Sequence, residues 1–504
     1  MAEPASAPLR ARRMRIDTYQ EPVLFMRRDC PVCQSEGFEA QSRVAVSWQG
    51  HRIVATLNVV DADFITGGEA GLSEAAWRLL GAPEGAEVQL AHPPPIESLG
   101  HVRAKVYGRP FSDAAIAEVV RDVAQGLYSD LQLAAFVTAC AGNRLDLRET
   151  VALTRAMVGA GETIDWGPGR VMDKHCVGGL PGNRTTMIVV PIAAACGLRM
   201  PKTSSRAITS PAGTADVMET VAPVALDVPA IRRVVEATGG CIVWGGSVRL
   251  SPADDVLIRV ERPLDLDSGS QLAASVLSKK AAAGSTHVLI DMPVGPTAKV
   301  RSSDAARSLS QLLQDVARAI GLQVRVLETD GNAPVGRGIG PALEARDVLA
   351  VLRGDAGAPR DLAQRSLLLA GELLEFGGIA SAGTGAASAA STLATGGAWR
   401  KFLEICEAQG GFAEPTLATH RRDVVSARSG HVVAIDNRRI ARIAKLAGAP
   451  KTPCAGLELH ANVGRFVERG EALFTVHAGS PGALAYALAY ADTQCDVVLV
   501  GGDD

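Results

Sequence analysis

The sequence predicts an α/β protein with a helical lobe, a larger mixed α/β lobe with a mostly parallel sheet, a small β-rich N-terminal domain and an α+β C-terminal domain. Three observations predict this fold. Both ends of the chain carry short strand-like runs, a helical period follows the first of them, and apolar runs alternate with helical stretches in the middle. Single cores stop growing near roughly 250–300 residues, so a chain of 504 residues should hold several domains.

The N-terminal domain is expected over residues 1–100. Residues 43–48 and 52–60 are rich in β-branched side chains, and residues 87–91 form another short strand-like run. Residues 93–95 are three consecutive prolines, which make a stiff boundary. We therefore expect a small accessory domain of β-strands.

The helical lobe is expected over residues 101–169, joined by residues 253–285. Ser112, Ser129 and Asp146 each precede a stretch with apolar residues on one face. Residues of these types are preferred N-caps. The sequence therefore predicts three short amphipathic helices in this lobe.

The α/β domain is expected over residues 170–420. Its strand-like apolar runs are residues 187–190, 288–290 and 324–327, and its helical stretches include residues 302–319 and 342–352. This alternation predicts a largely parallel sheet covered by helices. Residues 377–397 are biased toward Gly, Ala and Ser, which fits either a flexible linker or close helical packing.

The C-terminal domain is expected over residues 421–504. Short strand-like runs return there at residues 431–435, 457–459 and 472–476. Residues 456–477 superficially resemble half of a lipoyl or biotinyl carrier barrel. A carrier needs a lysine at the hairpin tip, where this chain has Gly464 and Arg465.

The charge balance excludes broad classes of partner. The formal net charge is −3, from 51 basic and 54 acidic residues, so no general field favours a nucleic acid polymer or an anionic membrane. The longest apolar run, residues 187–198, is too short to span a bilayer and contains Pro191. Any phosphate binding must therefore be local.

Cysteine usage indicates a reducing compartment, and we expect a cytoplasmic protein. The nine cysteines are an odd number scattered along a long chain, unlike a disulfide framework. Cys30 and Cys33 form the only CxxC, and no further zinc ligands follow nearby at recognisable spacing. We expect no metal site.

Two loops rich in Gly, Ser and Thr predict an anion pocket. The first loop, residues 173–186, holds Lys174 and two adjacent threonines, and the second, residues 203–214, repeats the pattern with Arg206. Glycines let the backbone approach an anion closely, and successive N–H groups can point at it. The alternative is a pair of ordinary loops with capping hydroxyls.

Long motifs in and around these loops resemble the thymidine phosphorylase and pyrimidine nucleoside phosphorylase family. They are DKHCVGG (residues 173–179), KTSSRAITSPAGTAD (202–216), SPADD (251–255), SQLAASVLSKK (270–280) and GRGIGPALEARDVL (336–349). The similarity covers about residues 112–477. The subgroup resembles archaeal AMP phosphorylase and the bacterial proteins grouped as putative thymidine phosphorylases.

This resemblance implies reversible phosphorolysis, in which a nucleoside and orthophosphate give a free base and a pentose 1-phosphate. Orthophosphate would be a co-substrate, and no organic cofactor is implied. The resemblance also implies a site in the cleft between the two lobes and a homodimer or a higher homo-oligomer. Shorter phosphorylases lack the N-terminal domain; the sequence leaves its role open, and higher assembly is one candidate.

Site residues follow from the resemblance position by position. The phosphate site maps to Lys174, Cys176, Gly178, Gly179, Thr186, Ser204, Ser205 and Thr214. The base and sugar side maps to Arg206, Ala207, Ile208, Thr209, Ser210, Ser275 and Lys279. Cys176 stands where the family commonly has serine, and because a thiol donates weakly, phosphate affinity would drop or a neighbouring N–H would substitute.

Two residues are candidates for the acid that protonates the leaving base. Asp267 matches the aspartate assigned as proton donor in the AMP phosphorylases. Leu264 and Leu266 suggest apolar surroundings that would raise its pKa, whereas a helix starting just after it would favour the ionised form. His175 is the other candidate acid, or a hydrogen-bonding partner of the base.

Substrate specificity rests on three further positions. Shorter thymidine phosphorylases carry a tyrosine and an arginine where this chain has Ile258 and Glu261, which argues against simple thymidine specificity. Lys299 matches the AMP phosphorylase lysine near the nucleotide 5′-phosphate. The alternative is an exposed loop lysine.

Two other functions fit parts of the pattern. A phosphoribosyltransferase like anthranilate phosphoribosyltransferase shares the fold and a Gly-rich anion loop, and would need a pyrophosphate-bearing donor and Mg²⁺. A non-catalytic nucleotide-binding or carrier module would bind ligand without turnover. Activity in excess EDTA would exclude the former, and any turnover would exclude the latter.

Overall fold

The computed structural model describes residues 8–207, 210–264, 266, 268–494 and 497–501. The chain divides into two compact units. One comprises residues 1–145 and 253–267, and the other comprises residues 146–252 and 268–504. Each unit has a hydrophobic core of its own.

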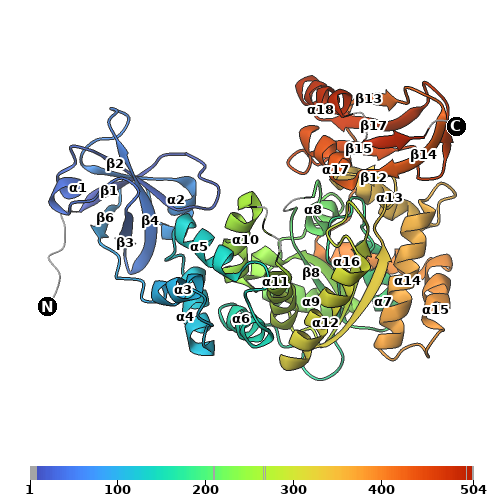
Figure 1. Ribbon diagram of the computed structural model, residues 1–504, viewed down its shortest axis with the longest axis horizontal. Helices are drawn as coiled ribbons and strands as arrows, with labels where there is room; N and C mark the ends of the chain where they lie inside the picture. Colours follow the sequence, from blue (N-terminus) through green and yellow to red (C-terminus); the bar gives the residue numbers. More distant parts are fainter. Residues whose placement is uncertain (1–7, 208–209, 265, 267, 495–496, 502–504) are drawn as a thin grey trace. The chain divides into compact units, whose positions relative to one another are not determined.

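The first unit begins with a closed six-stranded barrel of strand order β1-β5-β2-β4-β3-β6 (Figure 1). The strands are β1 (Leu9–Arg13), β2 (Val23–Arg27), β3 (Arg43–Trp48), β4 (His51–Val60), β5 (Glu69–Leu72) and β6 (Glu87–Ala91). Leu24, Val46 and Leu57 are fully buried inside it. The expected strands at residues 43–48, 52–60 and 87–91 are confirmed.

Helices make up the rest of the first unit. They are α1 (Pro31–Ser35), α2 (Glu74–Leu80), α3 (Leu99–Val106), α4 (Asp113–Ala124), α5 (Asp130–Cys140) and α10 (Pro252–Leu264). The side chains of Ser112 and Ser129 accept backbone N–H bonds at the starts of α4 and α5. Asp146 does the same for α6 (Leu147–Gly159) in the second unit. The three predicted helices and their N-caps are confirmed.

A parallel sheet forms the middle of the second unit, as predicted. β7 (Met172–Cys176), β10 (His287–Val294) and β11 (Gln323–Asp330) pair in the order β11-β10-β7. β8 (Met200–Ser204) pairs in parallel with β9 (Gly240–Trp244), and a parallel bridge between Val171 and Arg199 joins the two groups of strands. The carboxyl ends of β7 and β8 therefore lie at one edge, where open α/β sheets bind ligands.

Helices pack around this sheet. In addition to α6 they are α7 (Thr186–Ala195), α8 (Thr214–Glu219), α9 (Val228–Thr238), α11 (Gly269–Ala282), α12 (Ser303–Ala319), α13 (Pro341–Arg353), α14 (Arg360–Phe376), α15 (Gly385–Ala394) and α16 (Gly397–Gln409). The strand expected at residues 187–190 was wrong, because these residues belong to α7. Every residue from Thr186 to Ala194 is buried, so this helix has no polar face that would reveal its period.

The Gly, Ala and Ser bias of residues 377–397 reflects close helical packing. The α14 and α15 helices lie side by side (Figure 1). A Cβ atom added at Gly385 would lie 2.2 Å from the carbonyl oxygen of Gly371 on α14. Only glycine permits this approach, so the linker interpretation is wrong.

The C-terminal part contains two antiparallel sheets, of order β12-β15-β17-β13 and β16-β14-β18. Their strands are β12 (Gly338–Ile339), β13 (His420–Val425), β14 (Gly430–Ile435), β15 (Gly456–Leu459), β16 (Phe466–Val467), β17 (Ala472–Ala478) and β18 (Val498–Val500). Helices α17 (Asn437–Leu446) and α18 (Pro481–Thr493) cover them. The strands predicted in this region are confirmed.

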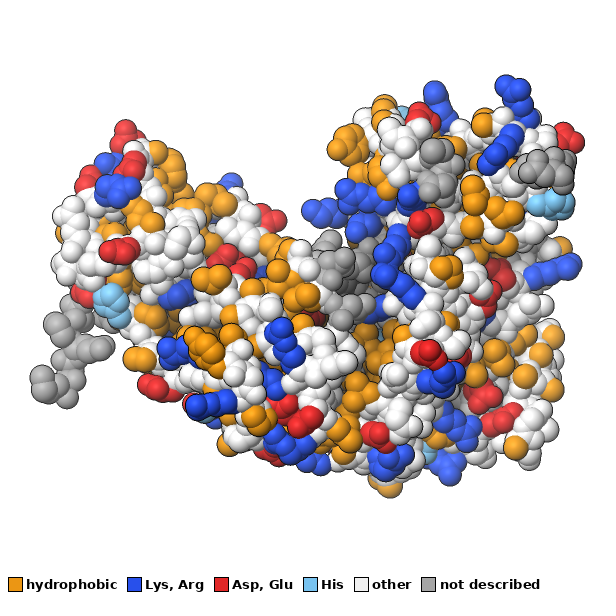
Figure 2. Space-filling model, viewed as in Figure 1, with side chains coloured by type: hydrophobic (Ala, Val, Ile, Leu, Met, Phe, Trp, Pro, Cys, Tyr) orange, Lys and Arg blue, Asp and Glu red, His pale blue; other side chains and the backbone are white. Residues whose placement is uncertain are grey.

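The surface fits the balanced composition. Figure 2 shows basic and acidic side chains interspersed over the visible face. Among the described residues, none of the helices combines the length and the apolar character that crossing a bilayer requires.

Candidate active site

The first Gly-rich loop connects β7 to α7 and depends on glycine for its shape. Gly178, Gly179 and Gly182 have φ angles of +99°, +83° and +74°, which L side chains rarely adopt. A Cβ atom at Gly182 would lie 2.1 Å from the carbonyl oxygen of Val335. The loop therefore holds its backbone close to neighbouring chain segments at the carboxyl end of β7.

Lys174 lies beneath this loop. Its side chain is fully buried, and its Nζ donates to Thr185 Oγ1 at 2.7 Å and lies 3.4 Å from Asp291 Oδ2. Asp291 also accepts from Thr329 Oγ1 at 2.6 Å and from Asn183 Nδ2 at 3.0 Å. Burial raises the pKa of Asp291, but the Lys174 charge and these hydrogen bonds outweigh it, so the pKa lies below its usual value.

A second buried ionic cluster lies next to Lys174. Asp173 Oδ1 is 2.9 Å from Lys202 Nζ, and its Oδ2 is 2.8 Å from Lys280 Nζ. Burial raises the pKa of Asp173, but the two lysines outweigh that effect and lower it overall. Burial lowers the pKa of Lys202 to about 7, although Asp173 opposes the shift. Positive charge is thus concentrated under the loop.

His175 and Cys176 are the last two residues of β7, and their pKa values are shifted by this buried, charged environment. Burial, followed by the charges of Lys280 and Lys202, lowers the pKa of His175 well below its usual value. The imidazole is therefore neutral at pH 7, which disfavours it as a proton donor. Burial raises the pKa of Cys176 to about 11, so its thiol stays protonated, and Asn183 Nδ2 lies 3.3 Å from its sulfur.

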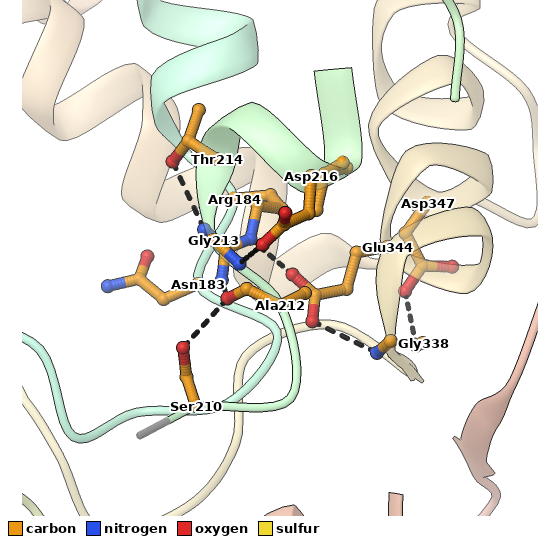
Figure 3. Close-up of polar contacts among 12 residues, drawn as sticks. Asn183, Arg184, Ser210, Ala212, Gly213, Thr214, Asp216, Gly338, Glu344 and Asp347 are labelled. Atoms are coloured by element: carbon orange, nitrogen blue, oxygen red, sulfur yellow. Dashed lines mark hydrogen bonds and ion pairs between the residues drawn. The ribbon is translucent and has the colours of Figure 1, made fainter. Parts of the chain in front are cut away.

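The second loop follows β8 and meets the first loop. Arg184 of the first loop donates to Thr214 Oγ1 and to the carbonyl oxygen of Ala212 (Figure 3). Asp216 Oδ2 accepts from the backbone N–H groups of Ala207 and Gly213 at 2.7 and 2.8 Å, which closes the loop on itself. Ser210 Oγ donates to the same Ala212 carbonyl at 2.9 Å.

Ser204, the last residue of β8, has a buried hydroxyl group that the chain leaves unpaired. The residue is 8% exposed, and its hydroxyl has no hydrogen-bond partner within the described part of the chain. Buried hydroxyl groups are almost always paired. An anion bound between the two loops would satisfy it.

Arg206, predicted on the base and sugar side, is held by carboxylates. Its guanidinium makes hydrogen bonds of 2.5 and 2.8 Å to Glu219 and one of 3.2 Å to Asp216. It also lies over the ring of Trp244, 4.8 Å from the centroid. These contacts fix the arginine within the second loop and neutralise its charge.

The other predicted substrate residues lie on two further segments. Ser275 and Lys279 face the same side of α11, where Lys279 Nζ donates to Ser275 Oγ at 3.0 Å. Lys299 is exposed, and its loop packs on the first loop so closely that a Cβ at Gly179 would lie 2.4 Å from the Lys299 nitrogen. Ile208, Thr209 and the predicted acid Asp267 lie outside the described residues.

Four residues of this region were not singled out from the sequence: Asn183, Arg184, Asp291 and Glu344. Arg184 and Glu344 form a buried ion pair although they are 160 positions apart in the chain. Glu344 stands within the motif at residues 336–349, which supported the resemblance without assigning this residue a role. Only the fold reveals the pair.

Comparisons with known proteins agree with this organisation. Residues 101–161 match the helical-bundle domain and residues 168–399 the α/β domain of the glycosyl transferase family. Residues 431–497 match the C-terminal domain of pyrimidine nucleoside phosphorylase.

Full-length relatives and one solved structure extend these matches. A putative thymidine phosphorylase of Polaromonas sp. is 73% identical over 98% of this chain and 96% of its own length. Another, from Hahella chejuensis, is 59% identical over 95% of this chain and 94% of its own length. Anthranilate phosphoribosyltransferase from Thermus thermophilus shares the fold, with a TM-score of 0.51 at 20% identity over 61% of this chain and 98% of its own. The chain therefore belongs to the thymidine and pyrimidine-nucleoside phosphorylase family of glycosyl transferases.

Proposed function

We propose that this chain catalyses phosphorolysis of the N-glycosidic bond of a pyrimidine nucleoside or of a nucleoside 5′-monophosphate. Orthophosphate attacks C1′ of the pentose as the base departs, and the products are the free base and a pentose 1-phosphate. With thymidine the products would be thymine and 2-deoxyribose 1-phosphate. The reaction would serve nucleoside or nucleotide catabolism and salvage.

The observation that carries this proposal is the unpartnered buried hydroxyl of Ser204 between the two loops. Arg184 of the first loop is hydrogen-bonded to Thr214 of the second, and Lys174 and Lys202 are buried on the neighbouring strands. Hydroxyl and N–H donors over a positive field suit a phosphate dianion. We therefore assign the phosphate to this pocket.

The departing base needs a proton or a strong hydrogen bond. Because the pKa of His175 is well below its usual value, its neutral ring can offer an N–H hydrogen bond but is a poor source of a proton at pH 7. We propose Asp267 as the proton donor, in keeping with the family resemblance. His175 would then act as a hydrogen-bonding partner.

The position of Lys299 favours a nucleoside 5′-monophosphate. The loop that carries it packs directly on Gly179, so Lys299 belongs to a segment that adjoins the proposed phosphate pocket. A second phosphate group on the substrate would need such a charge. The names of the relatives favour thymidine instead, which makes thymidine the second candidate substrate.

We also propose a cytoplasmic homodimer or higher homo-oligomer that needs no metal or organic cofactor. The scattered cysteines support a reducing compartment. Size-exclusion chromatography with light scattering would measure the assembly, and activity in excess EDTA would test metal independence. Loss of activity in EDTA would favour the phosphoribosyltransferase alternative.

The test is a chromatographic assay for free base released from thymidine, uridine, CMP and AMP, each with and without orthophosphate. Phosphate-dependent release from CMP or AMP but not from thymidine would support the monophosphate. Release from thymidine alone would make Lys299 an ordinary loop lysine. No release from any substrate would contradict the proposed reaction.

Lys299→Met separates the two substrate types. If Lys299 holds a 5′-phosphate, the variant should raise the KM for the monophosphate and leave the KM for orthophosphate nearly unchanged. Lys451→Met, at another exposed lysine, is the matched control. Equal effects of the two substitutions would remove Lys299 from the site.

A further inference from the structure

Arg184 joins the two loops of the candidate site through one guanidinium group. Its Nη1 donates to Thr214 Oγ1 at 3.1 Å, its Nη2 donates to the Ala212 carbonyl oxygen at 2.9 Å, and its Nε is ion-paired with Glu344 Oε2 (Figure 3). The side chain is nine-tenths buried, with 10% of it exposed. All three nitrogen atoms of this rigid planar group thus have a partner, and each partner is a different residue.

Glu344 anchors this arginine to a stable part of the fold. It lies in the first turn of α13 and is 1% exposed, and its other oxygen, Oε1, accepts from the backbone N–H of Gly340 at 3.0 Å. One turn later, Asp347 accepts from the N–H groups of Arg337 and Gly338 at 2.7 and 2.6 Å. These hydrogen bonds tie the start of α13 to β12 and the residues that flank it.

The contact with Thr214 determines what its hydroxyl can do. Arginine has only donors, so Thr214 Oγ1 must act as the acceptor in this bond. The single hydroxyl hydrogen of Thr214 then points away from Arg184 and is available to another acceptor. The N–H of Ala215 donates to the Ser205 carbonyl oxygen at 3.4 Å, so Thr214 adjoins the end of β8 where Ser204 lies.

Arg184 itself is poorly suited to bind an anion. Its charge is neutralised by Glu344, and two of its remaining N–H edges are used by Thr214 and Ala212. An arginine that binds phosphate directly usually presents a free bidentate edge to it. The positive charge of Arg184 is therefore used by Glu344, and the Thr214 hydroxyl is the group that would donate to the ligand.

We infer that Arg184 is a positioning residue, which orients the Thr214 hydroxyl toward orthophosphate while Glu344 holds the guanidinium in place. This inference rests on the proposed function, because it assigns the phosphate to the same pocket. It adds a role for a buried ion pair that does not itself touch substrate.

The test is a double-mutant cycle on orthophosphate affinity, measured by titration calorimetry with the full chain. Thr214→Val removes the hydroxyl and should weaken binding about 10- to 100-fold, the range for a hydrogen bond to a charged group. Arg184→Lys keeps the positive charge but loses the guanidinium N–H groups that contact Thr214 and Ala212. It should weaken orthophosphate binding about tenfold, a step of about 1.4 kcal/mol. In the Arg184→Lys background, Thr214→Val should then cost about tenfold less than it does in the wild type, because part of the hydroxyl contribution is already lost.

Steady-state kinetics add a second readout. Arg184→Lys should raise the KM for orthophosphate and leave the KM for the nucleoside within about twofold, because the other contacts of the pocket remain. Arg353→Lys, at an exposed arginine paired with Glu414, is the matched control and should change neither constant. A variant lacking both buried charges, Arg184→Met with Glu344→Leu, replaces Arg184→Lys in the cycle if the latter does not fold.

Two results would overturn the inference alone: an unchanged affinity in Arg184→Lys, and the same loss from Thr214→Val in both backgrounds. A wild-type chain that does not bind orthophosphate would overturn the inference and the proposed function together. The proposed function alone fails if wild-type protein binds orthophosphate and shows the expected cycle but releases no base. The affinity cycle needs no turnover, so the two failures are distinguishable.

Discussion

Replacing Asp173 by asparagine should destabilise the second unit, because two buried ammonium groups would lose the carboxylate they share. Lys202 and Lys280 lie 2.9 and 2.8 Å from its two oxygens, and Asp173 is fully buried. Removing one partner of a buried ion pair costs about 3–5 kcal/mol. We expect the upper end of this range, because the carboxylate serves two lysines.

The loss should be larger at pH 5.5 than at pH 8. Burial lowers the pKa of Lys202 to about 7 in the folded chain, and Asp173 opposes that shift. Without the carboxylate the folded-state pKa falls further, whereas the unfolded chain keeps a value near ~10.4. Below pH 7 the folded variant must bury an uncompensated charge or give up a proton that the unfolded chain retains, so its stability drops more than that of the wild type.

Native-state hydrogen exchange read by mass spectrometry measures this locally. Peptides covering β7 and β8 should lose protection in Asp173→Asn, while peptides covering β3 and β4 of the barrel serve as an internal control. Asp304→Asn, at an exposed carboxylate on α12, should change protection by less than about 0.5 kcal/mol. A loss of protection that is equal at both pH values would refute the charge argument.

Two other predictions concern His175 and Asn437. Because the folded-state pKa of His175 is depressed, the stability associated with its neutral form is present above its usual pKa and is lost as the pH falls below that value. In His175→Asn, the hydrogen-exchange protection of β7 should therefore fall less steeply between about pH 6.5 and 5 than in the wild type. An unchanged slope would contradict the depressed pKa of His175. Asn437 Nδ2 donates to Thr297 Oγ1 at 2.9 Å and to Gly331 O at 3.1 Å, so Asn437→Ala should loosen the loop that carries Lys299. If that loop holds a 5′-phosphate, the KM for the monophosphate should rise about tenfold and the KM for an unphosphorylated nucleoside should stay constant.

Elements with a clear period and a capping residue could be predicted from the sequence. Ser112, Ser129 and Asp146 begin helices as expected, because a side-chain oxygen that caps a helix acts within three residues. The α7 helix could not be identified in this way, because it is buried on every side and its Pro191 is more usual near a helix end. An amphipathic period and a capping residue reveal a helix in the sequence, and a helix that is buried on every side has no such period.

The candidate site likewise has some features that the sequence predicts and others that only the fold sets. Glycine-rich loops and their hydroxyls are visible in the sequence because backbone approach and donor chemistry require particular residue types. The partners that neutralise Arg206, or that hold Arg184, are set by contacts across the fold. Glu344 lies 160 positions from Arg184, and no spacing rule connects them. The sequence therefore indicated which loops form the candidate anion site but not which of its charges are paired with carboxylates.

The distribution of charge around the candidate site shows how a chain of net charge −3 could hold the proposed phosphate dianion. Lys174, Lys202 and Lys280 face Asp173 and Asp291 under the loops, and because the pKa of Lys202 is lowered to about 7, the positive charge exceeds the negative by at most one. The arginines of the loops, by contrast, are each paired with a carboxylate. Burial, together with the charge of these lysines, lowers the pKa of His175. In the proposed pocket the long-range attraction would come from the fixed buried lysines, and hydroxyl and N–H groups would make the direct contacts. In the proposed pocket, fixed hydroxyl and N–H donors rather than the carboxylate-paired loop arginines would therefore select the oxyanion by geometry.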